Sequence, residues 1–249
     1  LAIVVCIAMM VPTVAFAATS SPAKVDVKSA TAKSLTYNAK SQTTTIVVNG
    51  KTLTLNKDFK VVSGSLKATK AGTYTVKIKG IGNYSGDTTV KYTVNAQQSY
   101  KATAAAKTYN AKNQTTKVTV KYGNTVLKRG TDYKITGVTK AKNAGKYKIT
   151  VKGINNYKGI KTIYYTINKA AQKSVKVKVN ASKKKITVSG VKAKAKVTYK
   201  SANKKVKVKN GKITVVKGVK KGTKVRITVK VAATKNYKAY SKSIIYKVK

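Results

Sequence analysis

The chain has 249 residues, of which 54 are lysine or arginine and only 4 are aspartate or glutamate, so its formal net charge is +50 at pH 7. It contains no histidine, no glutamate and a single cysteine. Because these residues supply most general bases, metal ligands and thiol nucleophiles, the composition argues against most enzyme classes. A serine–lysine pair remains compatible with it, but no motif supports one.

The first 18 residues are predicted to be a signal peptide. An apolar run ends in Ala15-Phe16-Ala17, a small-x-small site of the kind that signal peptidase cleaves. We expect cleavage after Ala17 or Ala18, and we expect the natural chain to begin before Leu1. The only cysteine, Cys6, would be removed, which suits an export route without oxidative folding. Residues 19–31 are predicted to be a linker.

Two similar segments follow, at residues 32–95 and 105–168, and we call them repeat 1 and repeat 2. TYNAKSQTT in the first returns as TYNAKNQTT in the second, and AGTYTVKIKGIGNYSG returns as AGKYKITVKGINNYKG. Similarity at a fixed period is the signature of a repeated structural unit. Residues 96–104 between the two are predicted to be a second linker.

The third segment, residues 173–249, differs in sequence but also alternates apolar and polar residues. Its Asn210-Gly211 pair lies between two alternating runs, which predicts a type I′ hairpin. Seven short strands at this spacing are typical of an immunoglobulin-like sandwich. The predicted strands are Ser174–Val179, Lys185–Ser189, Ala193–Lys200, Lys205–Lys209, Lys212–Val216, Lys224–Val231 and Ser243–Val248.

The two repeats resemble small bacterial surface repeats marked by Tyr-Asn, a central Asp-Tyr or Asp-Phe, and a late Gly-x-x-Asn-Tyr-x-Gly. The matching residues are Tyr37-Asn38, Asp58-Phe59 and Gly80–Gly86 in repeat 1, and Tyr109-Asn110, Asp132-Tyr133 and Gly153–Gly159 in repeat 2. The third segment is similar to bacterial Ig-like domains of the Big type. Its matching residues are Val197–Asn203, Asn210–Thr214, Lys221–Thr223 and Asn236–Lys238.

This resemblance implies an all-β protein made of small tandem β-sandwich modules of the Ig-like kind. A β-grasp-like fold is the alternative for the two short repeats. Related modules serve as stalks, spacers and binding arms on exported bacterial proteins. The chain departs from these families in its charge, because acids are common in them and nearly absent here.

Five residues of the repeated motifs are candidates for structural roles. Asp58 and Asp132 are expected to cap a turn before an aromatic residue. The alternative for these two acids is catalysis of a lysine–asparagine isopeptide cross-link, which requires a buried acid. Tyr84, Tyr157 and Tyr237 are expected to close their modules as tyrosine corners. The alternative for these tyrosines is stacking on a sugar ligand.

Lysines alternate with apolar residues over much of the chain, which predicts strands with one cationic face. A solvated face explains the alternation but not the absence of acids, because aspartate or glutamate would solvate a strand equally well. The absence of acids indicates either a use for positive charge, for which we expect diffuse binding of anionic polymers, or a drift in composition across the lineage. The residues assigned to this role are Lys146, Lys148, Lys152, Lys192, Lys194, Lys196, Lys200, Lys205, Lys207, Lys209, Lys224, Arg226 and Lys230.

Together these features predict a non-enzymatic, structural or adhesive protein that is secreted or held at a bacterial cell surface. The expected partners are cell-wall teichoic acids or acidic glycans, with no cofactor, metal or small-molecule substrate. One alternative is a sequence-independent binder of extracellular DNA, since nucleic acid is the general partner of basic proteins. The other is a passive spacer. No sorting motif or C-terminal anchor is found, so retention at the wall would be ionic.

Overall fold

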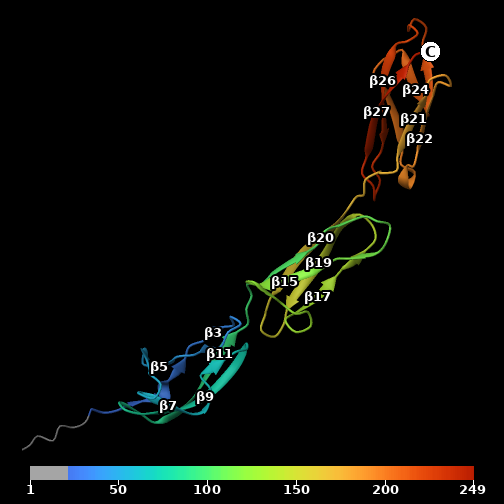
Figure 1. The fold of residues 1–249 in the computed structure, drawn as a ribbon. Coiled ribbons are helices and arrows are strands. Elements are labelled where there is room, and N and C mark those ends of the chain that lie inside the picture. Colours follow the sequence, from blue (N-terminus) through green and yellow to red (C-terminus); the bar gives the residue numbers. More distant parts are fainter. Residues whose placement is uncertain (1–21) are drawn as a thin grey trace, which may run out of the picture. The chain divides into compact units, whose positions relative to one another are not determined.

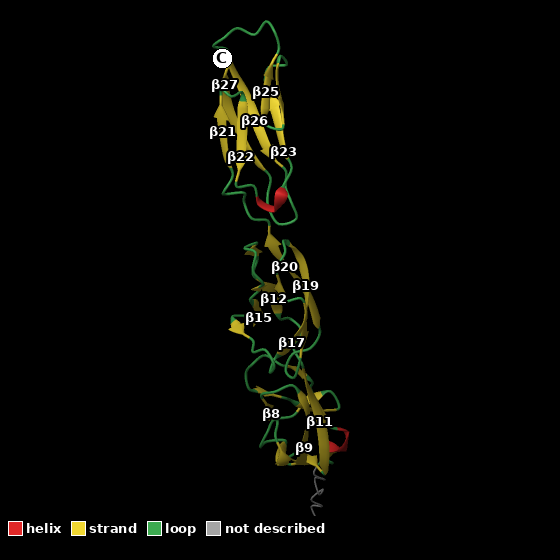
Figure 2. Ribbon diagram, turned by 90° about the vertical axis from the view of Figure 1, so that its right-hand side faces the viewer, coloured by secondary structure: helices red, strands yellow, loops and turns green. Residues whose placement is uncertain are grey.

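The computed structural model describes residues 22–249, and the predicted signal peptide therefore lies outside the described residues (Figure 1). The protein is all-β, as the sequence predicts. Its only helical elements in the described range are two three-residue 3-10 helices, η1 (Val27–Ser29) and η2 (Lys192–Lys194) (Figure 2). A β-grasp fold packs an α-helix on its sheet, so this alternative for the repeats is wrong. No helix of residues 22–249 is long and apolar enough to cross a membrane.

The chain divides into two compact units, one ending at Asn95 and one spanning Ala96–Lys249. The first unit contains repeat 1. Its four-stranded sheet has the order β3 (Leu35–Thr36), β11 (Asp87–Asn95), β9 (Gly72–Gly80) and β7 (Phe59–Gly64). Its three-stranded sheet has the order β2 (Thr31–Ala32), β5 (Ile46–Val48) and β6 (Lys51–Thr52). Two further pairs are β1 (Val25–Asp26) with β10 (Tyr84–Ser85), and β4 (Gln42–Thr43) with β8 (Lys67–Ala68).

The core of the first unit lies between these sheets because each long strand alternates. Val76 and Ile78 of β9 are fully buried and pack against Ile46 and Val48 of β5. Val27 joins the same cluster and has no exposed surface, although it belongs to the segment predicted to be a linker. The folded unit therefore begins before repeat 1, because the core needs the apolar side chain that η1 supplies.

Repeat 2 has the corresponding strands in the corresponding order. Its four-stranded sheet is β13 (Lys107–Thr108), β20 (Ile160–Asn168), β19 (Gly145–Gly153) and β17 (Tyr133–Gly137). Its three-stranded sheet is β12 (Lys101–Ala104), β15 (Val118–Tyr122) and β16 (Thr125–Val126), and β14 (Gln114–Thr115) pairs with β18 (Lys140–Ala141). In both repeats the strand of the larger sheet that comes first in the chain pairs in parallel with the strand that comes last. These pairs are β3 with β11 in repeat 1 and β13 with β20 in repeat 2.

Tyr100 anchors the start of repeat 2, although it also falls in a predicted linker. Its ring is buried, and its hydroxyl donates to the carbonyl oxygen of Gly159 at 2.7 Å and accepts the N–H of Gly153 at 3.0 Å. Burial raises the pKa of the Tyr100 hydroxyl, and the hydrogen bond from Gly153 opposes this rise. The hydroxyl therefore remains a neutral donor at physiological pH.

A stacked tyrosine pair occupies the same place in the two repeats. The ring centroids of Tyr74 and Tyr92 are 5.2 Å apart, and those of Tyr147 and Tyr165 are also 5.2 Å apart. Burial raises the pKa of Tyr92 and of Tyr165, and the neighbouring tyrosine of each pair adds to the rise. The repeated sequence thus conserves an aromatic contact as well as a strand order.

Residues 173–249 form a seven-stranded sandwich with immunoglobulin topology. One sheet has the order β21 (Lys176–Asn180), β22 (Lys185–Ser189), β25 (Lys212–Val215) and β24 (Val206–Lys209). The other has the order β23 (Val197–Ser201), β26 (Lys224–Val231) and β27 (Tyr240–Lys247). If the strands are lettered A to G along the chain, the sheets are A-B-E-D and C-F-G, the arrangement of a constant-type immunoglobulin domain. We call them the ABED and CFG sheets.

The segment 191–200 is only partly a strand, which corrects the prediction of a strand from Ala193. The strand β23 begins at Val197, and Lys192 and Lys194 lie in η2. Ala193 and Lys194 have φ angles of 55° and 47°, which no β-strand accommodates. Ala193 is exposed, so its side chain does not contribute to the core. The two lysines therefore lie in a turn rather than on a sheet face.

The predicted hairpin at Asn210-Gly211 is confirmed. Both residues have positive φ, 48° and 80°, and they join Lys209 directly to Lys212 across a two-residue loop. This is the geometry of a type I′ turn. A Cβ added to Gly211 would meet the backbone oxygen of Ile186 on the neighbouring strand. Gly211 is thus fixed both by its φ angle and by the close approach of β22.

We predict that Gly211→Ala lowers the free energy of unfolding by at least about 2 kcal/mol, because strain at positive φ adds to a backbone clash. Gly222→Ala is the matched control, since Gly222 has a φ of 88° but open space around it. It should cost only about 1 kcal/mol. Urea unfolding of both variants measures the difference. Equal losses would contradict the close approach at Ile186.

Candidate functional site

The Asn-Tyr motif holds the chain that enters its own module. At Asn83-Tyr84, Asn156-Tyr157 and Asn236-Tyr237 the motif backbone pairs in parallel with an incoming segment. The paired residues are Val25 with Tyr84, Gln97 with Tyr157, and Ala170 with Tyr237. The incoming N–H donates each time to the carbonyl oxygen of the motif asparagine, at 2.9–3.0 Å. The motif is therefore a clamp for the segment that precedes each module.

The rings of these motifs are not presented to a ligand. Tyr84 and Tyr157 are only 5% and 4% exposed, and Tyr237 is half-buried with its ring edge-on to Tyr109 at 5.4 Å. Burial excludes the stacking of a sugar on Tyr84 and Tyr157. The hydroxyl-to-backbone contact typical of a tyrosine corner is made by Tyr74 and Tyr147, each to the carbonyl oxygen four residues upstream.

Asn236 also uses its side chain, and this contact joins the C-terminal sandwich to repeat 2 within the second unit. Its Oδ1 accepts the N–H of Ala144 at 2.8 Å, and its Nδ2 donates to Oδ1 of Asn143 at 3.0 Å. Both bonds are partly shielded from water, so they contribute more than exposed contacts of the same kind. The motif thus stabilises the junction as well as the module.

Asp58 and Asp132 cap equivalent turns. Oδ2 of Asp58 accepts the N–H of Thr54 at 2.8 Å, and Oδ2 of Asp132 accepts the N–H of Lys128 at 2.7 Å. Both carboxylates lie in exposed surroundings. The isopeptide chemistry considered for these acids requires a buried carboxyl, which neither residue provides.

Lysines stand directly opposite lysines on the outer faces of the sheets. This occurs at six places in the described part of the chain, and in every module. The pairs are Lys60–Lys79, Lys101–Lys121, Lys134–Lys152, Lys185–Lys212, Lys209–Lys212 and Lys224–Lys247. Like charges directly opposite each other destabilise a sheet. The surface therefore carries a repulsion that stability alone does not explain.

Few acids offset this repulsion. The only ion pair among residues 22–249 joins Lys28 to Asp26, at 3.8 Å. Residues 173–249 contain 26 lysines and arginines and no acid. Within the described range no three His, Cys, Asp or Glu side chains come together as metal ligands would. The electrostatic field of the C-terminal sandwich is thus positive on all sides.

The ABED sheet carries the densest lysine face. Lys212 on β25 is flanked by Lys185 on β22 and by Lys209 on β24, so three ammonium groups form one row across neighbouring strands. Strands in a sheet are about 4.8 Å apart, which brings these charges well within a Debye length at physiological salt. The other exposed lysines of this face are Lys176, Lys178 and Lys207.

The lysines assigned from the sequence do not form one surface. Lys207 and Lys209 are on the ABED face, whereas Lys200, Lys224, Arg226 and Lys230 are on the outer face of the opposite CFG sheet. Lys146, Lys148 and Lys152 are on β19 of repeat 2. Lys196 and Lys205 are exposed just before β23 and β24, and Lys192 and Lys194 lie in η2.

Four lysines of the ABED face were not among the residues assigned from the sequence, namely Lys176, Lys178, Lys185 and Lys212. The signal for one pair was available, because a two-residue hairpin at Asn210-Gly211 places Lys209 opposite Lys212. The contact between β22 and β25 joins strands that are distant in sequence, so alternation alone does not reveal it.

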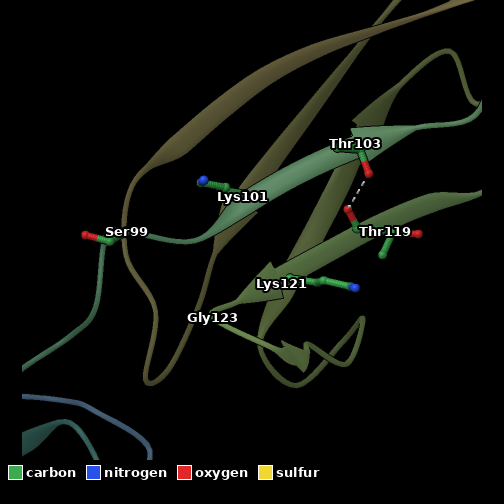
Figure 3. Close-up of a pocket in the computed structure, with 6 residues that line it drawn as sticks. All are labelled: Ser99, Lys101, Thr103, Thr119, Lys121 and Gly123. Carbon is green, nitrogen blue, oxygen red and sulfur yellow. Dashed lines mark hydrogen bonds between the residues drawn. The ribbon is translucent and has the colours of Figure 1, made fainter.

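A shallow hollow lies on the outer face of β12 and β15 in repeat 2 (Figure 3). Its volume is about 430 Å³, and Ser99, Lys101, Thr103, Thr119 and Lys121 contribute to its lining. Figure 3 shows the two lysines extending from neighbouring strands with their ammonium groups pointing to opposite sides, as repulsion favours. The hollow therefore offers hydroxyl groups and cations to a ligand.

No protein-family model matches this chain, and no curated protein matches it. Solved structures that show some similarity include the Drosophila N-cadherin EC1-4 fragment, at 11% identity with a TM-score of 0.25, covering 93% of this chain and 74% of that one. The Sidekick-1 immunoglobulin domains 1-5 give 12% identity and a TM-score of 0.24, covering 89% of this chain and 58% of that one. Such scores carry no argument about function, and the fold assignment follows from the strand order.

We predict that Lys212→Thr raises the free energy of unfolding by about 0.5 kcal/mol at low salt, because it removes two cross-strand repulsions. The gain should vanish in high salt, where the charges are screened. Lys178→Thr is the control, since Lys178 faces Thr187 on the same sheet surface. Urea unfolding at two salt concentrations measures both. A gain that persists in high salt would identify strand propensity as the cause.

We predict that Asn236→Ala lowers the free energy of unfolding by about 1–2 kcal/mol, because two partly buried hydrogen bonds are lost. Hydrogen exchange at the Ala144 amide should accelerate, since this amide loses its acceptor. Asn83→Ala is the control, because the Asn83 side chain makes no hydrogen bond within residues 22–249. Unchanged protection at Ala144 would show that Asn236 does not hold the junction.

Proposed function

We propose that this chain is an exported, non-enzymatic bacterial protein, structural or adhesive in role, whose Ig-like modules bind anionic polymers at the cell surface or in the secreted state. The observation that carries the proposal is the set of lysine pairs that oppose each other across the sheets without acids to offset them. A bound polyanion would reduce this repulsion, so its binding would also stabilise the folded modules.

The mechanism of binding is counterion release summed over several faces. A polymer that replaces the counterions of many lysines gains affinity that falls steeply with salt. Lysine is a compact point charge, so the contacts do not depend on a particular sequence or shape of the ligand. Because both faces of the C-terminal sandwich are basic, one module can contact two polymer strands. Several modules in one chain then add avidity.

Teichoic acids and acidic glycans are the proposed ligands, and extracellular DNA is the alternative. Both arginines, Arg129 and Arg226, are separate from each other in the fold, and guanidinium groups are the usual readers of base edges. The proposal therefore favours polymers recognised by charge density. A location at the wall would follow from ionic retention.

The first experiment is sedimentation of the mature protein with purified Gram-positive walls, with and without teichoic acid, across a salt series. We expect binding that falls linearly on a log–log salt plot, by at least about tenfold between 50 and 200 mM salt. Replacing Lys207, Lys209 and Lys212 together by threonine should weaken binding and reduce the salt slope by about one for each lysine in contact.

The matched control replaces three exposed lysines outside the strands, Lys183, Lys220 and Lys221, by threonine. This control has the same net charge as the triple variant of the ABED face, and it should bind the walls more tightly than that variant. Binding that ignores both salt and wall polymer would overturn the proposal and leave a passive spacer. Competition by DNA at lower concentration than by wall polymer would identify nucleic acid as the ligand instead.

A further inference from the structure

The outer face of β17, β19 and β20 in repeat 2 presents ordered rows of side chains. Because the strand register is known, each row can be written across the three strands. The first row is Lys134, Lys152 and Ile160, and the second is Thr136, Thr150 and Thr162. Lys148 and Tyr164 form the third row, and Lys146 and Thr166 the fourth. Cations, hydroxyls and one aromatic ring thus share a single surface.

Tyr164 is the unusual member of this face. Its side chain is 50% exposed, and Ile160 on the same strand is 63% exposed. The ammonium group of Lys146 lies over the Tyr164 ring, 4.4 Å from its centroid. Within residues 22–249 no acid forms an ion pair with Lys146, so its ammonium group can exchange its contact with the Tyr164 ring for one with a ligand carboxylate. A ligand that displaces the ammonium group from the ring face can therefore contact both the ring and the ammonium group.

Repeat 1 provides an internal comparison, because its β9 and β11 pair in the same register as β19 and β20 of repeat 2. At the position of Tyr164 it has Lys91, and at the position of Ile160 it has Asp87. The positions of Lys146 and Lys148 are Thr73 and Thr75 in repeat 1. The aromatic platform and its flanking lysines are therefore absent from the first copy. Maintenance of the common fold does not require them.

We propose that this face of repeat 2 binds an acidic polysaccharide whose pyranose rings carry carboxylates. The inference rests on the polyanion function proposed above and names its ligand class. One sugar ring lies with its C–H face on Tyr164, and its carboxylate pairs with Lys146 or Lys148. The threonine row of Thr136, Thr150 and Thr162 supplies hydroxyls to neighbouring sugar hydroxyls.

The composition of the face favours this ligand over two other polyanions. A polyol phosphate has no ring to stack, so Tyr164 and Ile160 would gain nothing from it. Single-stranded nucleic acid is bound by several aromatic side chains that stack successive bases. This face has one exposed ring, with hydroxyls on both sides, which suits a polyhydroxylated chain better than a run of bases.

The test uses the full mature chain and three probes, polygalacturonate, polyphosphate and oligo(dT). At moderate salt, Tyr164→Ala should weaken polygalacturonate binding about threefold to tenfold, because the aromatic contact is lost. Polyphosphate binding should not change. Tyr164→Phe should restore polygalacturonate binding, because the ring remains.

Tyr164→Lys separates stacking from charge, because it replaces the ring by the residue that repeat 1 has at this place. It should tighten polyphosphate binding and weaken polygalacturonate binding. Tighter binding of both probes would overturn the inference and leave the general polyanion function intact. Loss of oligo(dT) binding as large as that of polygalacturonate in Tyr164→Ala would also overturn it. If the unaltered protein binds no probe, the function proposed above fails as well.

Discussion

The two-residue period of the β-strand is the constraint on which the rest of the structure depends. A β-protein with a net charge of +50 can form a core only if the charged side chains of its strands point away from that core, which the strand allows at every second residue. In β26, Val225, Ile227, Val229 and Val231 are buried while the residues between them face outwards. The same separation that makes the core also gathers the lysines, so folding and the cationic faces have one cause.

Much of the C-terminal sandwich could be predicted from this period. Lys185–Ser189 and Lys224–Val231 have the predicted bounds, because each combines β-branched residues with strict alternation. The prediction failed at residues 193–196, where alternation was present but alanine was the apolar partner. Alternation alone therefore did not decide the conformation of this stretch, where Ala193 and Lys194 have positive φ and belong to a turn.

The contacts that decide the site were harder to predict, since they join strands that are distant in sequence. Nothing in the local pattern places Lys185 beside Lys212, and a shift of one residue would have turned either side chain to the other face. The predicted linkers turned out to contain residues of the folded modules, and the reason is similar. Val27 and Tyr100 are buried by partners more than 15 residues away, which composition does not report.

The Asn-Tyr motif, which both repeats share, serves folding, whereas the exposed Tyr164, which only repeat 2 has, is a candidate for ligand binding. The motif tyrosines Tyr84 and Tyr157 are buried, and the motif backbone clamps the entering chain, so selection for folding explains its repetition. Tyr164 belongs to no repeated motif and is exposed on a sheet that folds in repeat 1 with lysine at the same place. At a position where the fold accepts several residues, ligand binding can determine which residue is present. Differences between the copies therefore locate a candidate binding site more sharply than the features they share.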